Sequence, residues 1–318
     1  MERFKVFAIA LVFSFAGSNL FCQSLNEELD ALWAQFLEHQ NTAPGAELLY
    51  NIGSLGRGNV LAVNSINSFI TQQNELFASG GSIDYATISA AIAAIMELGD
   101  SSSYPVLFDV IFLGYPEVIS FEALGALELI PGNFKQFLYD AIEYSEPAKK
   151  FIAFRTGMNS ERLSLADRGQ LAELALEKSL LTSENNADLS AMRYASVVSL
   201  ASLRWTRASP LAIRHYYRVL ADFQQGIASK QRFLEAIALL GAVGNSDAAL
   251  VLALQLGLIN ARSERTGEFD AEITHAVVQA LGQIGDNAVF DHLLSVGDLP
   301  YPEHIHVAAR EAIERLRW

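Results

Sequence analysis

The chain has almost no cysteine, since Cys22 is the only one among 318 residues. A single cysteine forms no intramolecular disulfide, and it excludes the zinc sites that several thiolates build. Histidine supplies no substitute, because the rings of His304 and His306 would lie about 200° apart around a helix. We therefore expect no disulfide, no metal site and no cofactor, and a fold that is stabilised by packing.

Basic residues are also scarce: 22 lysines and arginines face 36 acidic residues, which gives a net charge of −14. A field of this sign repels nucleic acid and anionic lipid, so we predict neither as a partner. The linear motifs of catalysis, such as HExxH and G-x-S-x-G, are missing too. The glycines of "GSLGRG" (53–58) lack the Gly-Lys-Ser/Thr of a phosphate-binding loop. The sequence thus predicts no catalytic residue.

Long hydrophobic runs are missing beyond the first residues. Arg3 and Lys5 precede an apolar run of 11 residues at 6–16, which is the order of a secretory signal and too short for a stable transmembrane helix. We predict a signal peptide at 1–22 and an exported chain at 23–318, periplasmic or associated with the cell envelope, without stable membrane insertion once the signal is removed. The alternatives are an uncleaved anchor and a lipid anchor at Cys22, which the bulky preceding residue disfavours.

Helical periodicity dominates the remaining sequence. Apolar residues recur at helical spacing from Leu29 to Leu37, and further amphipathic stretches follow along the chain. All eight prolines fall between such stretches or at their starts, where a helix tolerates proline. No alternating strand pattern of useful length is present, so we predict an all-α protein.

A segment of the sequence also repeats. "LLGAVGNSDAALVL" (239–252) returns 41 residues later as "ALGQIGDNAVFDHLL" (280–294), and the same plan surrounds Gly99 and Gly132. Each unit predicts a helix, a glycine that ends it in the left-handed conformation, an Asn or Asp cap, and a second helix. In the last full unit the apolar stripes are Ile273, Val277, Leu281 and Ile284, then Val289, Phe290, Leu293 and Leu294. One pair of helices cannot bury both apolar stripes completely, so we expect further helix pairs to stack on it.

Helix pairs at this interval, joined by L-G-x-x-G-[DN], resemble the HEAT-repeat family in its short bacterial form. The resemblance implies an α-solenoid, a superhelix of stacked antiparallel helix pairs, that serves as a binding scaffold. Units are expected at about 86–116, 117–150, 232–270 and 271–302, weaker ones at 45–80 and 190–230, and an end cap at 303–318. An irregularity is expected near 155–190 and a polar loop at 260–272. The alternative is a non-repeating helical bundle.

Charge is polarised along the chain. Residues 97–146 hold nine acidic residues and one base, whereas residues 190–232 hold seven basic residues and one acid. Arginine beside aromatic residues is typical of interface hot spots and of carboxylate or phosphate recognition. The candidate partner-binding residues are Arg193, Arg204, Trp205, Arg207, Arg214, His215, Tyr217 and Arg218. The alternative is that these arginines pair with acids of neighbouring repeats while the aromatic rings belong to the core.

The sequence therefore favours an exported, non-enzymatic scaffold that binds a protein partner through a helical-repeat surface. Two alternatives stay open. One is an α-solenoid lyase or hydrolase whose groove uses His215, Tyr216, Tyr217 and the arginines, and the other is a structural envelope component that associates with itself. On the first interpretation, Arg214→Glu combined with Arg218→Glu should abolish partner binding while leaving the helical content intact. The oligomeric state is not predicted.

Overall fold

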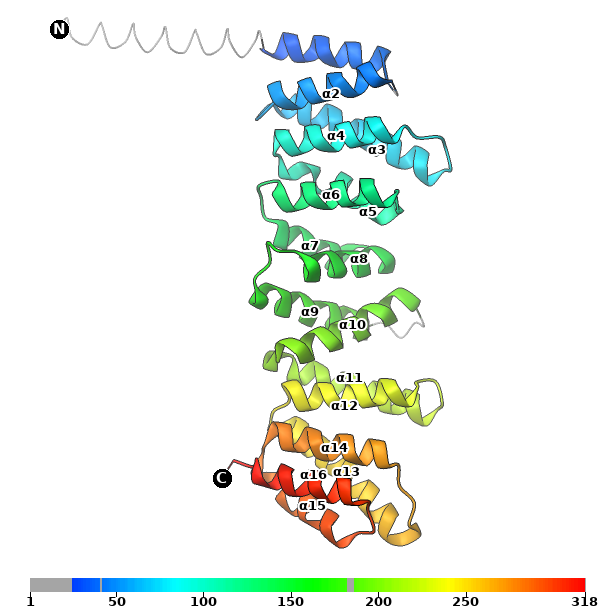
Figure 1. Cartoon of the computed structure of the whole chain (residues 1–318), viewed down its shortest axis with the longest axis vertical. Helices are drawn as coiled ribbons and strands as arrows, with labels where there is room; N and C mark the ends of the chain where they lie inside the picture. The colour runs from blue at the N-terminus through cyan, green and yellow to red at the C-terminus, as the bar shows by residue number, and fades with distance from the viewer. Residues whose placement is uncertain (1–24, 41, 182–185, 318) are drawn as a thin grey trace, which may run out of the picture. The chain divides into compact units, whose positions relative to one another are not determined.

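The computed structural model describes residues 25–40, 42–181 and 186–317 (Figure 1). Throughout these ranges the regular elements are helices, and the one β-bridge, between Asp286 and Arg317, is isolated. The predicted all-α class is thus confirmed. The predicted signal peptide at 1–22 and the candidate lipid site at Cys22 lie outside the described residues.

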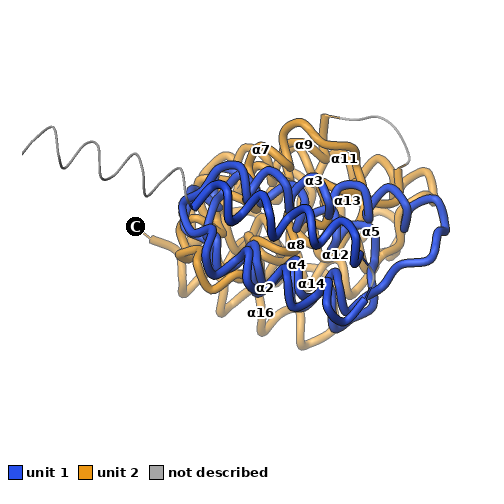
Figure 2. The backbone as a smooth tube through the Cα atoms, turned by 90° about the horizontal axis from the view of Figure 1, so that it is seen from above, with its two compact units in different colours: residues 1–137 blue, residues 138–318 orange. Residues whose placement is uncertain are grey.

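Two compact units divide the chain, one up to Phe137 and the other from Leu138. In the first unit a helix at 25–38 precedes five complete helices and the start of α7. Helix α2 packs on α4 and α4 on α6, while α3 packs on α5, so even-numbered and odd-numbered helices form two layers. Figure 2 shows α2 and α4 on one side of this unit and α3 on the other. The bounds are α2 (Ala43–Leu55), α3 (Val60–Ala78), α4 (Tyr85–Leu98), α5 (Tyr104–Leu113), α6 (Glu117–Leu129) and α7 (Phe134–Tyr144).

The second unit has the same two-layer plan. Helices α8, α10, α12, α14 and α16 pack in sequence, and α9, α11, α13 and α15 form the other layer (Figure 2). Each unit is therefore an α-solenoid arrangement of stacked helix pairs, as predicted. The bounds are α8 (Pro147–Asn159), α9 (Leu165–Leu180), α10 (Ala187–Leu203), α11 (Ser209–Gln224), α12 (Lys230–Val243), α13 (Ser246–Thr266), α14 (Ala271–Ile284), α15 (Phe290–Leu294) and α16 (Glu303–Glu314).

The first glycine of the repeated L-G-x-x-G motif allows close approach of neighbouring helices. A Cβ on Gly241 of α12 would lie 2.9 Å from the Cα of Ala280 in α14, and a Cβ on Gly282 would lie 2.9 Å from the Cα of Ala312 in α16. Real Cβ atoms essentially never show such distances to a backbone atom. The Leu-Gly repeat therefore marks the contact between successive even-numbered helices, which the sequence did not reveal.

The second glycine of this motif ends its helix in the left-handed conformation, as predicted, in some units. Gly99 and Gly285 have φ angles of 68° and 69°, and each ends its helix in the left-handed conformation. Gly244 has φ −69°, so the prediction is wrong there. The caps agree with the prediction: the side chain of Asn245 accepts a hydrogen bond from the Ala248 amide at 3.2 Å, which satisfies a donor at the start of α13.

Two predicted irregular segments are more helical than their composition indicates. The polar sequence at 260–266 continues α13, because Asn260 is held by the next helix pair: its Nδ2 donates to Ser295 Oγ at 2.9 Å and its Oδ1 accepts from Tyr301 at 2.9 Å. In the region near 155–190, α8 continues to Asn159 and α9 starts from a capping box of Ser164 with Asp167. The predicted core position Leu294, the last residue of the short helix α15, is 53% exposed.

Candidate functional site

The eight candidate residues do not form one surface. They lie on α10, α11 and the short 3₁₀ turn between them, Thr206–Ala208, and they fall into three groups. One group occupies the turn, one faces outward from α11, and one is turned inward between α10, α11 and α12. The groups are Arg204, Trp205 and Arg207, then Arg214 and Tyr217, then Arg193, His215 and Arg218.

In the turn group, two of the three residues, Trp205 and Arg207, contact other parts of the fold. Trp205 Nε1 donates to Glu173 Oε2 at 2.8 Å, and its ring packs so closely on Gly169 that a Cβ there would lie 2.5 Å from it. Arg207 pairs with the same carboxylate at 3.3 Å. Arg204 is exposed and ends α10 with φ 49°. For Arg207, therefore, the alternative that the arginines pair with acidic residues of neighbouring repeats is the one that the structure bears out.

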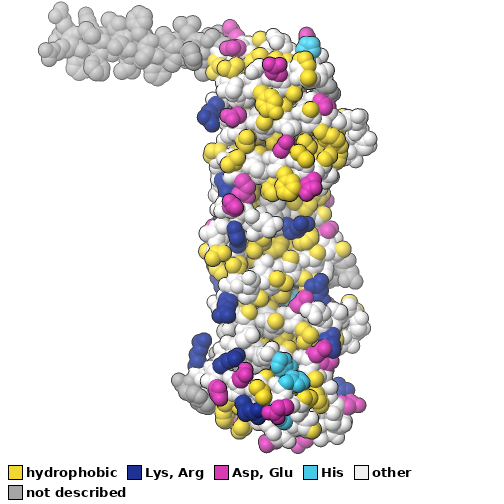
Figure 3. Space-filling view, in the orientation of Figure 1, with side chains coloured by type: hydrophobic (Ala, Val, Ile, Leu, Met, Phe, Trp, Pro, Cys, Tyr) yellow, Lys and Arg dark blue, Asp and Glu magenta, His cyan; other side chains and the backbone are white. Residues whose placement is uncertain are grey.

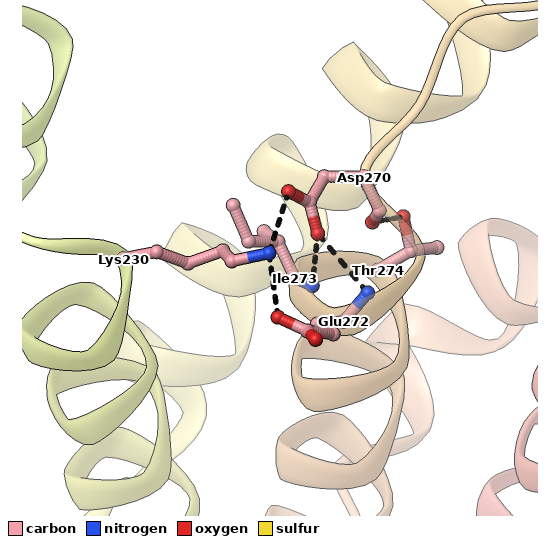
Figure 4. Close-up of polar contacts among 5 residues, drawn as sticks. All are labelled: Lys230, Asp270, Glu272, Ile273 and Thr274. Carbon is pink, nitrogen blue, oxygen red and sulfur yellow. Dashed lines mark hydrogen bonds and ion pairs between the residues drawn. The ribbon is translucent and has the colours of Figure 1, made fainter.

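Lys230, another base of the 190–232 segment, is likewise paired. Its Nζ lies 2.6 Å from Glu272 Oε2 and 3.4 Å from Asp270 Oδ2, so it joins the start of α12 to the start of α14 (Figure 4). Asp270 also caps α14 by accepting hydrogen bonds from the amides of Glu272 and Ile273. The hydrogen bond to Glu272 raises the pKa of Lys230. This lysine holds adjacent repeats together.

The inward group, with Tyr194 and Arg232, forms what we call the inner basic cluster. Arg193 is only 6% exposed, its guanidinium lies 5.1 Å from the Tyr194 ring centre, and its Nε has no hydrogen-bond partner in the described structure. The Arg232 guanidinium lies 3.8 Å from the same ring centre. Arg218, partly buried, donates to the Leu180 carbonyl at 3.4 Å. Two of the three guanidinium groups, those of Arg193 and Arg232, thus lie against one aromatic ring.

His215 completes this cluster as a neutral group. It is fully buried, its ring lies 5.8 Å from that of Tyr194, and neither ring nitrogen has a hydrogen-bond partner among the described residues. Burial lowers the pKa of His215 to about 3, and repulsion by Arg193, Arg218 and Arg232 adds to the shift. The imidazole therefore carries no charge at neutral pH, which is unsuited to accepting and returning protons in that range.

The outward group belongs to a larger exposed face. Arg214 and Tyr217 are exposed on α11, and the adjacent α13 exposes Leu250, Leu254 and Leu258 to 51%, 65% and 70%. The two helices are in contact, and Tyr216 donates to Gln255 of α13 at 3.2 Å. We call Arg214, Tyr217 and the three leucines the outer face of α11 and α13. Sequence reasoning missed the leucines, although their spacing of four residues, beside a separate buried stripe, was a readable signal.

The first unit carries an apolar groove across α2, α4 and α6, with a volume of about 330 Å³. Hydrophobic side chains gather over these helices in Figure 3. Within the groove, Oε2 of Glu122 is buried and makes no hydrogen bond to any described residue. Glu122 and Tyr50 are the only titratable side chains in its lining, so no set of acid, base and nucleophile converges there. The lining is Tyr50, Ser89, Ile92, Ala93, Met96, Glu122, Gly125, Ala126 and Leu129.

The described ranges contain no group of three or more His, Cys, Asp or Glu side chains placed to hold a metal ion. They also contain no helix long and apolar enough to cross a membrane. The rings of His275 and His304 lie 5.4 Å apart in an edge-to-face contact. Comparison of the chain with protein-family models and with curated protein sequences finds no match.

Proposed function

We propose that this protein is a non-enzymatic, HEAT-like scaffold that binds a protein partner on the outer face of α11 and α13. The observation that supports the proposal most directly is the leucine stripe of α13, in which Leu250, Leu254 and Leu258 are all at least half exposed. Exposed leucines are common singly, but three on one helix face form a contiguous apolar surface of the kind that marks an interaction site.

The residues beside the stripe suit an interface as well. Arg214 makes no ion pair with another described residue, and Tyr217 is 50% exposed next to it. Arginine and tyrosine are enriched among the residues that dominate binding energy, and an apolar stripe at helical spacing suits the apolar face of a partner helix. We therefore expect the partner to present an amphipathic helix with an acidic residue opposite Arg214.

The test is site-specific photo-crosslinking in cells that express the full chain. A benzophenone amino acid at Tyr217 or Leu254 is expected to give an adduct of one discrete mass, and the same probe at exposed Gln279 of α14 is expected to give none. Leu250→Lys with Leu258→Lys should reduce the adduct at least about tenfold, because burial of each leucine contributes ~1.5–3 kcal/mol. An adduct that persists in this variant, or forms equally at Gln279, would contradict the proposal.

The same experiment separates the two alternatives. An adduct of twice the chain's mass would identify self-association, as expected of a structural envelope component. The enzyme alternative loses support from the neutral state of His215 and from the apolar lining of the first unit's groove.

Export is a second part of the proposal. It rests on the basic start at Arg3 and Lys5 and on the short apolar run at 6–16. The mass of the mature N-terminus, measured on protein from fractionated cells, checks it: a start near residue 23 in the envelope fraction supports export, and an intact Met1 in the cytoplasm contradicts it.

A further inference from the structure

The inner basic cluster holds a charge that no described residue compensates. Arg193 is 94% buried, given its 6% exposure, and it forms no ion pair or hydrogen bond with any residue that the structure describes. Removing a guanidinium from water is strongly unfavourable unless an opposite charge or several hydrogen bonds replace the water. Among the described residues, the contact that offsets this burial is with the ring of Tyr194, whose centre lies 5.1 Å from the guanidinium.

The neighbouring charges add to the imbalance. Burial lowers the pKa of Arg218, and repulsion by the positive charge of Arg193 lowers it further. The guanidinium of Arg232 lies 3.8 Å from the centre of the Tyr194 ring. Among the described residues, acidic groups reach the outer members: Glu235 pairs with Arg232 at 2.9 Å, and Asp222 attracts Arg218. Neither carboxylate pairs with Arg193.

We infer that the inner basic cluster is a binding site for an oxyanion, a phosphate or carboxylate group that pairs with Arg193. Guanidinium groups bind both kinds of group through two parallel N–H donors, and the planar contacts with Tyr194 hold two of the three guanidinium groups in fixed positions. Neutral His215 has two ring nitrogens without partners, one of which is a donor that can complete the site. This inference is independent of the proposed partner on the outer face of α11 and α13.

The geometry also limits the size of the ligand. The cluster reaches solvent through Arg232, whose side chain is 42% exposed, while Arg193 and His215 lie in the interior. A single oxyanion group therefore fits better than an extended polyanion, which the net charge of −14 repels.

The test compares thermal unfolding of the full chain in sodium phosphate, sodium acetate and sodium chloride at equal ionic strength. For the wild type we expect phosphate or acetate to raise Tm by about 2–4 °C at tenfold above Kd. In Arg193→Met this anion-specific rise is lost, while Tm in chloride equals or exceeds that of the wild type, because the uncompensated charge is gone. Lys230→Met removes a base of the same segment that has its own acidic partners, and it should keep the rise.

If Arg193→Met does not fold, a second measurement on other variants still tests the inference. The ³¹P resonance of inorganic phosphate is expected to broaden in the presence of wild type and of Lys230→Met, and to broaden much less with Arg232→Met. A response to phosphate alone identifies a phosphate site, and a response to acetate alone identifies a carboxylate site. An equal response in Arg193→Met and wild type, or none in the wild type with either anion, overturns the inference.

Discussion

His215 links burial to the pH dependence of stability. Its folded pKa of about 3 lies below the ordinary value of 6.5, so the folded state excludes the proton that the unfolded state accepts. Stability from this group is complete above pH 6.5 and is lost as pH falls towards 3. We expect this group alone to lower the free energy of unfolding by about 1.4 kcal/mol for each pH unit in this range. Urea unfolding between pH 7.5 and 4.5 measures this slope.

His215→Leu provides the control, since leucine fills a similar volume and does not titrate. The variant should lose less stability than the wild type between pH 6.5 and 4.5, while other titrating groups contribute equally to both profiles. Parallel profiles would mean that His215 takes up its proton at the same pH in the folded and unfolded states, and would contradict its placement in the core.

The sequence identified three residues of the inner basic cluster, Arg193, His215 and Arg218, but not their position, and it did not identify Tyr194 or Arg232. Arg193 and His215 were predicted to be part of an exposed partner surface, whereas both are buried. The helical spacing of Arg193 relative to apolar residues indicated its burial. One face of α10 is formed by Leu189, Arg193, Val197 and Leu200, and that face is buried. Composition alone could not show that Arg193 lacks a counter-charge among the described residues, because the charged groups near it come from α11 and α12, which are distant in sequence.

At the scale of a helix, the repeated Leu-Gly pair sets how closely α12 approaches α14. A methyl group at Gly241 meets the Cα of Ala280 at 2.9 Å, so Gly241→Ala forces the two backbones apart. Such overpacking costs about 1–3 kcal/mol, which outweighs the ~1 kcal/mol that alanine contributes inside a helix. We expect a net loss of stability in urea unfolding.

Gly257→Ala is the matched control, because this glycine is also inside a helix, α13, and the nearest atom to its added Cβ is 3.6 Å away. Here only the helix propensity acts, and the variant should gain about 0.5–1 kcal/mol. If both variants changed stability in the same direction, close approach would not be the reason for glycine at position 241.

The helices themselves were largely predictable, and the exceptions have a common cause. Starts and ends follow local signals, such as Asn245 as a cap and Gly285 as a left-handed stop. The polar end of α13 was predicted as a loop because its stabilising contacts, from Asn260 to Ser295 and Tyr301, come from the following repeat. Local composition carries no information about such partners.

At the scale of the whole molecule, the sequence repeat predicted that helix pairs stack, but it did not predict which apolar surfaces remain exposed after stacking. The pattern of α13 shows apolar residues on more than one side, yet only its packing on α11, α14 and α15 decides which of them remain exposed. The outer face of α11 and α13 is therefore a property of the assembled layers. The same dependence on neighbours makes stability local, because each helix pair in a stack contacts only the pairs next to it.

Gly282→Leu tests this locality within the second unit. Its side chain would meet Ala312, where even a Cβ lies 2.9 Å from the Cα, and so would separate α14 from α16. In hydrogen exchange followed by mass spectrometry we expect the fastest exchange in α14 and α16, a smaller increase in α12 and α13, and no change in α8 and α9. That order follows from nearest-neighbour coupling, since strain at one interface reaches other helices only through the pairs between them. Equal acceleration from α8 to α16 would instead show that the unit opens as one cooperative body, and the stacked-pair description of its energetics would then be wrong.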